Sequence, residues 1–200
     1  MFLKKTKSIL SVVWAKLNNP SPAEVALNHE DVIVSMAKIF KPKVYVELGL
    51  YECRLFNKMI PLVSEKLIGV DVSLKAGEYM DKNSKSEFKC MTTDKFAEEL
   101  MERKLVIDMM FIDADHSEKS VLKDFENYFP YVKEDGLIFL HDGYPKNQEY
   151  TQSGYCGDGY KAIFALSKQT ENHEMVTLPL APGLTICRKR TKQMKWLNNN

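Results

Sequence analysis

Short apolar runs alternate with segments of helical periodicity through the middle of the chain. The first run, Val44 to Leu48, is rich in β-branched residues and nearly all apolar, which is typical of a strand buried on both faces of a parallel sheet. Similar runs recur at regular intervals. We predict strands at 44–48, 67–72, 87–91, 107–112 and 136–140, with helices at 52–64, 75–82, 94–104 and 117–129 between them. This alternation predicts a parallel sheet with helices on both faces.

The last part of the chain has a different pattern. After a predicted helix at 159–168, strands at 174–179 and 184–188 are separated by a short connection that contains Ala-Pro-Gly. Only antiparallel strands can be joined so briefly. The sheet is therefore expected to finish in an antiparallel hairpin.

Two helical segments precede the first predicted strand. The N-terminus has a basic start and a short apolar patch, as a signal peptide does, but the patch is at the low end of what secretion requires. An amphipathic helix with Ile9, Val13 and Leu17 on one face is the preferred interpretation. It could dock on the domain, on a second subunit in a homo-oligomer, or on lipid.

A second helix is predicted from Pro22 to Phe40, with Ser21 as its N-cap. We therefore divide the chain into N-terminal helices (1–40), one domain (41–190) and a polar tail (191–200).

Composition narrows the class of protein. The chain has 200 residues, 44% of them hydrophobic and 28% charged, which suits one domain with a substantial core. Its 28 basic and 27 acidic residues nearly balance, so neither nucleic acid nor a membrane surface is expected as the main partner. No run is long enough for a transmembrane helix. Four scattered cysteines indicate reduced thiols in a cytoplasmic protein.

The ends of the first two predicted strands carry residues that suit a nucleotide-like ligand. Glu47 and Gly49 close the first strand, and Asp71 closes the second, 22 residues after Gly49. In doubly wound sheets such a ligand lies across the carboxyl ends of the strands, where a glycine lets the backbone approach it. A carboxylate about 20 residues further on accepts hydrogen bonds from ribose hydroxyls. Strand-end acids that cap helix N-termini are the alternative.

These residues resemble the first two motifs of the class I S-adenosylmethionine-dependent methyltransferases. The first motif reads Glu47-Leu-Gly49-Leu-Tyr51-Glu52-Cys53, and Tyr51 and Cys53 stand where the family has its second and third glycines. Tyrosine there is common among the small metal-dependent O-methyltransferases and their antibiotic-sugar relatives, whereas Cys53 is less usual. The resemblance implies a Rossmann-like three-layer α/β fold whose mostly parallel, seven-stranded sheet ends in an antiparallel hairpin. The cofactor-binding residues that it implies are Glu47, Gly49, Tyr51, Asp71, Val72, Thr93 and Asp113.

A second group of polar residues follows the fourth and fifth predicted strands. Asp113, Asp115 and His116 end one strand, and His141 and Asp142 end the other. Because adjacent parallel strands end over one crevice, oxygen and nitrogen ligands gather on one side of a small pocket. Mg²⁺ suits such an arrangement, and a histidine ligand would admit manganese, iron or zinc more readily.

This second group resembles the metal site of the catechol-type and macrolide-sugar O-methyltransferases. By position, Asp113 is the first ligand and Asp142 the second, while His141 replaces the first member of an acidic pair. Those families place a base three residues after the first ligand, which here is His116. Asp115 is the rival base, and capping of the following helix is the alternative role for His116. A plain N-cap is likewise the alternative explanation for Thr92, Thr93 and Asp94, which follow the third predicted strand.

Together the motifs predict an S-adenosylmethionine-dependent enzyme that methylates a hydroxyl of a small molecule or sugar with the help of a divalent metal. The competing hypotheses are an oxidoreductase or hydroxylase on the same scaffold and a binding module that has lost its chemistry. The loop with Tyr150, Tyr155 and Tyr160 could be a substrate lid or simple aromatic packing. His29 and His173 are interpreted as surface or helix residues rather than ligands.

Overall fold

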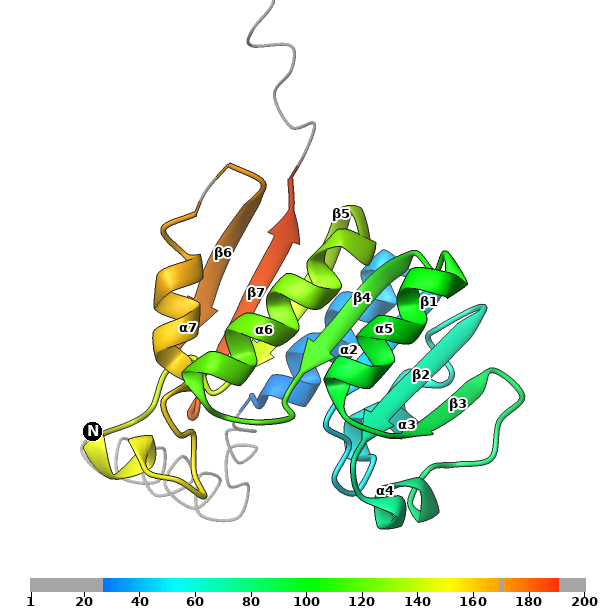
Figure 1. Cartoon of the computed structure of the whole chain (residues 1–200), viewed down its shortest axis with the longest axis horizontal. Coiled ribbons are helices and arrows are strands. Elements are labelled where there is room, and N and C mark those ends of the chain that lie inside the picture. The colour runs from blue at the N-terminus through cyan, green and yellow to red at the C-terminus, as the bar shows by residue number, and fades with distance from the viewer. Residues whose placement is uncertain (1–26, 170, 191–200) are drawn as a thin grey trace, which may run out of the picture.

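One mixed sheet forms the middle of the molecule. The computed structural model describes residues 27–169 and 171–190. Its strands are β1 (Val44–Leu48), β2 (Lys66–Asp71), β3 (Ser86–Cys90), β4 (Ile107–Ile112), β5 (Val132–His141), β6 (His173–Leu178) and β7 (Leu184–Lys189). Within the described residues they form one sheet of seven strands in the order β3-β2-β1-β4-β5-β7-β6 (Figure 1). The strands from β1 to β5 pair in parallel, and β7 pairs antiparallel with both β5 and β6.

Helices cover both faces of this sheet. They are α2 (His29–Phe40), α3 (Arg54–Met59), α4 (Leu74–Glu78), α5 (Thr93–Arg103), α6 (Glu118–Tyr128) and α7 (Gly159–Leu166), with short 3-10 turns η1 (Phe129–Tyr131) and η2 (Gln148–Thr151). In Figure 1, α5, α6 and α7 lie in front of the sheet, and α2 and α3 lie behind it. The three-layer fold and its closing antiparallel hairpin are thus confirmed.

The period-2 pattern of the strands divides the core in two. In β1, Val46 and Leu48 pack with the residues of α5, α6 and α7, while Tyr45 packs with those of α2 and α3. In β4, Met110 belongs to the first side and Met109 to the second. Both faces of β1 and β4 are therefore buried, which accounts for their nearly continuous apolar sequence.

Two predicted helices differ most from their expected bounds. The helix predicted from Pro22 begins at His29, because the Asn28 side chain accepts a hydrogen bond from the N–H of Asp31 and the Asn28 N–H donates one to the Asp31 carboxylate. This capping box ends the helix on its N-terminal side. Helix α3 stops at Met59, two residues before Pro61, which lacks the N–H to continue it.

The predicted amphipathic helix with Ile9, Val13 and Leu17, the Ser21 cap and the polar tail lie outside the described residues. No helix in the described ranges is both long and apolar enough to cross a membrane.

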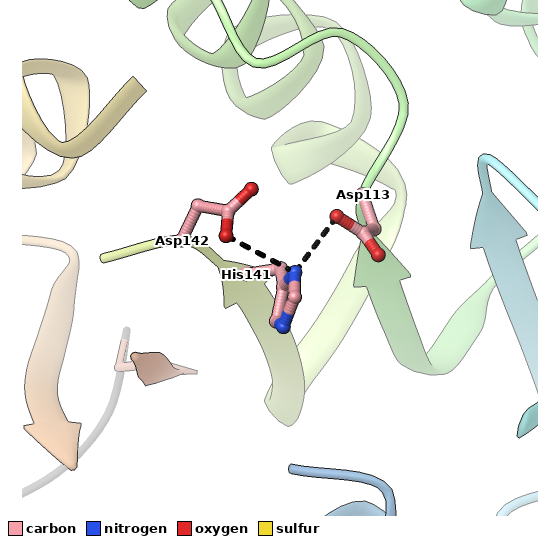
Figure 2. Close-up of side chains that lie close together, drawn as sticks. All are labelled: Asp113, His141 and Asp142. Atoms are coloured by element: carbon pink, nitrogen blue, oxygen red, sulfur yellow. Dashed lines mark hydrogen bonds and ion pairs between the residues drawn. The ribbon is translucent and has the colours of Figure 1, made fainter. Parts of the chain in front are cut away.

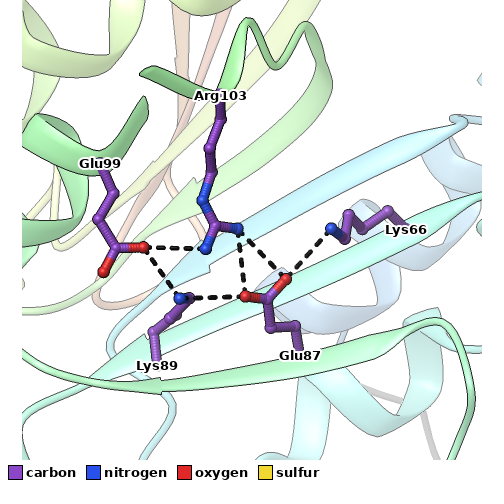
Figure 3. A network of polar contacts seen from close by, with 5 residues as sticks. All are labelled: Lys66, Glu87, Lys89, Glu99 and Arg103. Carbon is purple, nitrogen blue, oxygen red and sulfur yellow. Dashed lines mark hydrogen bonds and ion pairs between the residues drawn. The ribbon is translucent and has the colours of Figure 1, made fainter. Parts of the chain in front are cut away.

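The outer edge of the sheet at β3 carries a network of charges. Figure 3 shows Glu87 of β3 paired with Lys66, Lys89 and Arg103, and Lys89 and Arg103 also pair with Glu99 of α5. Burial raises the pKa of Glu87, but the hydrogen bonds from Lys89, Lys66 and Arg103 outweigh it and lower the pKa to about 2. Charged side chains on an edge strand also discourage pairing with another chain.

Candidate active site

The loop after β1 brings the backbone of two strands very close together. Gly49 has φ +82°, and a Cβ at this position would collide with the backbone carbonyl of Asp113 at the end of β4. Only glycine fits both the conformation and the space. Tyr51 and Cys53 also have positive φ values, 48° and 54°. The loop therefore adopts left-handed conformations at the two positions where the family has glycines, although both residues carry side chains.

Asp71 at the end of β2 holds this loop in place. One of its carboxylate oxygens accepts hydrogen bonds from the N–H groups of Leu50 (2.9 Å) and Tyr51 (3.3 Å), and the other accepts one from Ser73 (2.8 Å). The carboxylate thus ties the ends of β1 and β2 together and lies beside the open space between them.

Two cavities adjoin Gly49 and Asp71. One, of about 530 Å³, is lined by these two residues together with Tyr51, Asp113 and His116. The other, of about 360 Å³, extends toward the ends of β2 and β3 and is lined in addition by Val72 and Thr93. Six of the seven predicted cofactor-binding residues therefore line one continuous region at the carboxyl ends of the parallel strands, where the strand order reverses between β1 and β4.

The seventh, Glu47, does not line either cavity. Its side chain is buried on the α2 and α3 side of the sheet and accepts a 2.6 Å hydrogen bond from the Tyr45 hydroxyl. Burial raises the pKa of Glu47 to about 8. Its role in cofactor binding stays a prediction.

Thr93 is not the cap of α5. The N-cap is Thr92, whose hydroxyl accepts from the N–H of Lys95. The carbonyl of Thr93 accepts a hydrogen bond from the Tyr128 hydroxyl (2.6 Å), and the residue lines the smaller cavity.

The predicted metal ligands converge at the ends of β4 and β5. Figure 2 shows the His141 ring between the carboxylates of Asp113 and Asp142. Nδ1 of His141 lies 3.0 Å from Oδ1 of Asp113 and 3.4 Å from Oδ1 of Asp142. One ligand atom from each of the three residues lies within 4.8 Å of the other two. The chemistry of this donor set, two carboxylates and one imidazole, fits a divalent metal ion.

His116 lies beside this cluster on the side of the cavity of about 530 Å³. Its Nδ1 donates to the Tyr155 carbonyl (2.7 Å) and lies 2.9 Å from Oδ2 of Asp142, while Nε2 lies 3.5 Å from Oδ1 of Asp113. The hydrogen bond with Asp142 raises the pKa of His116 to about 9, although partial burial opposes the shift.

The structure excludes one of the two roles proposed for His116. The N-cap of α6 is Ser117, whose hydroxyl accepts from the Ser120 N–H. His116 is therefore not the helix cap, and that alternative is wrong. The rival base, Asp115, accepts a hydrogen bond from the Ser117 N–H (2.8 Å), and its hydrogen bonds with Ser117 lower its pKa.

The structure adds a residue that the sequence did not indicate. The ring of His29, at the start of α2, lies 4.2 Å from the ring of His141 and stacks on Phe111 at 5.9 Å. Burial and the nearby His141 lower the pKa of His29. A lone histidine at the start of a helix gives no signal of this position, because α2 and β5 meet only in the tertiary structure.

The loop after β5 closes the cluster from the other side. Tyr150 and Tyr155 pack against each other with ring centroids 5.4 Å apart. This loop and residues 114–117 line a third cavity of about 760 Å³, which reaches His116 and contains Asp158 and Lys161. Aromatic packing in the loop is thus present, and its role as a lid stays a prediction.

Comparison by sequence agrees with this geometry. A family described as a methyltransferase domain matches residues 46–143, the stretch that runs from the glycine loop through the His141 and Asp142 pair. This match over nearly half of the chain confirms the resemblance of its strand-end motifs to methyltransferases. A search of curated proteins by sequence finds no match.

Solved methyltransferase structures share the fold. An O-methyltransferase from Bacillus cereus in complex with S-adenosylhomocysteine is 12% identical, with a TM-score of 0.70 over 92% of this chain and 90% of that one. The O-methyltransferase TomG from Streptomyces achromogenes, involved in tomaymycin synthesis and bound to S-adenosylmethionine, is 10% identical, with a TM-score of 0.65 over 90% and 89%. PaMTH1 from Podospora anserina, bound to S-adenosylhomocysteine, is 13% identical, with a TM-score of 0.65 over 95% and 97%.

Proposed function

We propose that the methyltransferase domain binds S-adenosylmethionine and methylates a hydroxyl oxygen of a small molecule or sugar with a divalent metal. The observation that carries this proposal is the junction of two sites at one strand end. The cavity beside Gly49 and Asp71 meets the cluster of Asp113, His141 and Asp142 at His116. A methyl donor and an acceptor hydroxyl could therefore be held next to each other.

The cofactor site follows from the cavities. The smaller cavity, between Val72 and Thr93, would take the adenine, and Asp71 at its border would accept hydrogen bonds from the ribose. The larger cavity, beside Gly49 and Tyr51, would take the amino-acid end. Bound structures of TomG and of the B. cereus O-methyltransferase contain S-adenosylmethionine and S-adenosylhomocysteine, which supports the choice of cofactor.

The metal would be held by Asp113, His141 and Asp142. When bound there, a divalent ion supplies Lewis acidity that lowers the pKa of an acceptor hydroxyl. Two carboxylate ligands are compatible with Mg²⁺, which binds oxygen atoms.

His116 is the proposed base. Its Nδ1 is held by the Tyr155 carbonyl, which leaves Nε2 as the atom that takes a proton. With Asp142 engaged as a metal ligand, the largest contribution that raises the pKa of His116 would weaken, so the pKa would fall and more of the imidazole would be neutral and able to accept the proton. Asp115, whose pKa is lowered by Ser117, is the weaker base of the two.

Calorimetry with S-adenosylmethionine and then with NAD, with and without Mg²⁺, tests the cofactor class. We expect S-adenosylmethionine to bind and NAD not to bind. Asp71→Asn should weaken the binding of S-adenosylmethionine about tenfold or more. Binding of NAD alone would instead favour an oxidoreductase.

Separate His116→Gln and Asp142→Asn variants test the chemistry. Both are expected to keep cofactor binding while methyl transfer to a panel of phenolic and sugar hydroxyls falls about 100-fold or more. Cofactor binding without transfer to any acceptor in the wild-type protein would support a binding module and contradict the proposal.

A further inference from the structure

Resting on the proposed function, we infer that His141 makes this site selective for a first-row transition metal, such as manganese, iron, cobalt or zinc, over magnesium. The inference concerns which ion the three side chains prefer. It goes beyond the presence of a metal, because an all-oxygen site and a site with an imidazole differ in the ions that they favour.

The first observation is the identity and orientation of the donor atoms. His141 presents its Nδ1 to both carboxylates, at 3.0 and 3.4 Å. Two donor atoms that share one ion at about 2.1 Å, at octahedral or tetrahedral angles, are separated by about 3.0 to 3.4 Å. The His141 nitrogen thus lies at a spacing from each carboxylate that suits a small divalent ion, Mg²⁺ included, and the preference among such ions comes from the nitrogen donor.

The second observation is that the His141 ring is fixed in this orientation. The side chain is only 13% exposed. Its ring packs against His29 at 4.2 Å and meets Phe111 edge-on at 5.9 Å. Packing on these two rings limits rotation about the side-chain bonds, so Nδ1 stays directed at Asp113 and Asp142.

The third observation concerns the other ring nitrogen. Nε2 of His141 is buried and has no hydrogen-bond partner among the described residues. Nδ1 is therefore the ring nitrogen that faces the cluster and could bind a metal ion directly. Magnesium dehydrates reluctantly and prefers oxygen, whereas an imidazole nitrogen suits manganese, iron, cobalt and zinc.

The test compares metals rather than activities. The full chain is stripped with a chelator, and Co²⁺, Mn²⁺ and Mg²⁺ are titrated separately by calorimetry, with the visible absorption of Co²⁺ as a second signal. The decisive variant is His141→Asp, which makes all three ligands carboxylates. We expect the ratio of the Mg²⁺ Kd to the Co²⁺ Kd to fall at least tenfold in this variant, with weaker Co²⁺ absorption.

Two further variants locate the effect. Asp113→Asn should weaken every metal, because it removes a shared carboxylate, while Asp81→Asn, at an exposed acid outside the cluster, should change none. Ring-nitrogen NMR with diamagnetic Zn²⁺ adds a direct readout: the His141 Nδ1 signal should shift on binding in the wild-type protein. This signal also serves if His141→Asp fails to fold.

Equal metal ratios in the wild-type protein and His141→Asp, or an unshifted His141 Nδ1 signal, would overturn the inference. If S-adenosylmethionine binds by calorimetry while no metal binds, the inference fails and the cofactor part of the proposed function stands. If neither S-adenosylmethionine nor a metal binds, the proposed function fails, and the inference that rests on it fails with it.

Discussion

At the scale of single residues, a few positions decide whether the cofactor cavity exists. Gly49 is the clearest, because the backbone of Asp113 occupies the space that any side chain would need. The strand-end motif indicated a glycine there, but its reason became visible only when β4 was placed beside β1.

A Gly49→Ala variant should therefore be strongly destabilised. The clash with the Asp113 carbonyl adds to the cost of a positive φ, and we expect a loss of about 3 kcal/mol in the free energy of unfolding. Gly154→Ala is a matched control, since Gly154 also has a positive φ (93°) but nothing within 4 Å of its added Cβ. That control should lose only about 1 kcal/mol. Chemical denaturation measures both, and equal losses would contradict the role of the clash.

Glu47 gives a prediction about pH. Its unfolded pKa is near 4.5 and burial raises the folded value to about 8, so the folded state keeps a proton that the unfolded state releases. The free energy of unfolding should consequently fall as the pH rises from about 4.5 to about 8.

Glu47→Gln cannot ionise, so it should flatten this slope. Between pH 5 and pH 8, the free energy of unfolding should fall by about 2 kcal/mol less in the variant than in the wild-type protein. Urea denaturation at a series of pH values is the measurement. Parallel curves for the two proteins would show that Glu47 is already ionised in the folded state.

At the scale of elements, the edge strand β3 depends on charge more than on burial. None of its five residues is fully buried, and Glu87 is held by Lys66, Lys89 and Arg103. The neighbouring strands β1 and β4 are instead stabilised by apolar burial on both faces.

Glu87→Gln should weaken the attachment of β3. Because the folded pKa of Glu87 lies near 2, its contribution is present above about pH 4.5 and is lost as the pH falls toward 2. At pH 7 we expect the variant to be about 0.5 to 1 kcal/mol less stable, with a smaller loss at high salt. Glu102→Gln, at an exposed residue of α5, is the control and should be near neutral. A variant as stable as the wild-type protein at low salt would contradict the network.

At the scale of the whole molecule, the cofactor cavity spans the ends of several strands, so ligand binding should stabilise the entire domain. At a concentration of 100 times Kd, S-adenosylmethionine or S-adenosylhomocysteine should add about 2.7 kcal/mol. For a chain of this size, that corresponds to a rise in Tm of about 5 to 10 °C. Differential scanning calorimetry measures it, with Asp71→Asn as the variant that should lose about half of the effect or more at the same ligand concentration. A shift with NAD of the same size would argue against the assigned cofactor.

The sequence by itself determined the order and type of nearly all described elements, because each strand and helix has a local period that its own residues create. Strand ends also indicated Gly49, Asp71, Asp113 and Asp142, since an acid or glycine after a buried strand is a local pattern. Only the tertiary structure could show that Glu47 turns into the core and that His29 lies against His141. Both facts depend on contacts between elements that are far apart in the sequence, so no short segment of the chain indicates them.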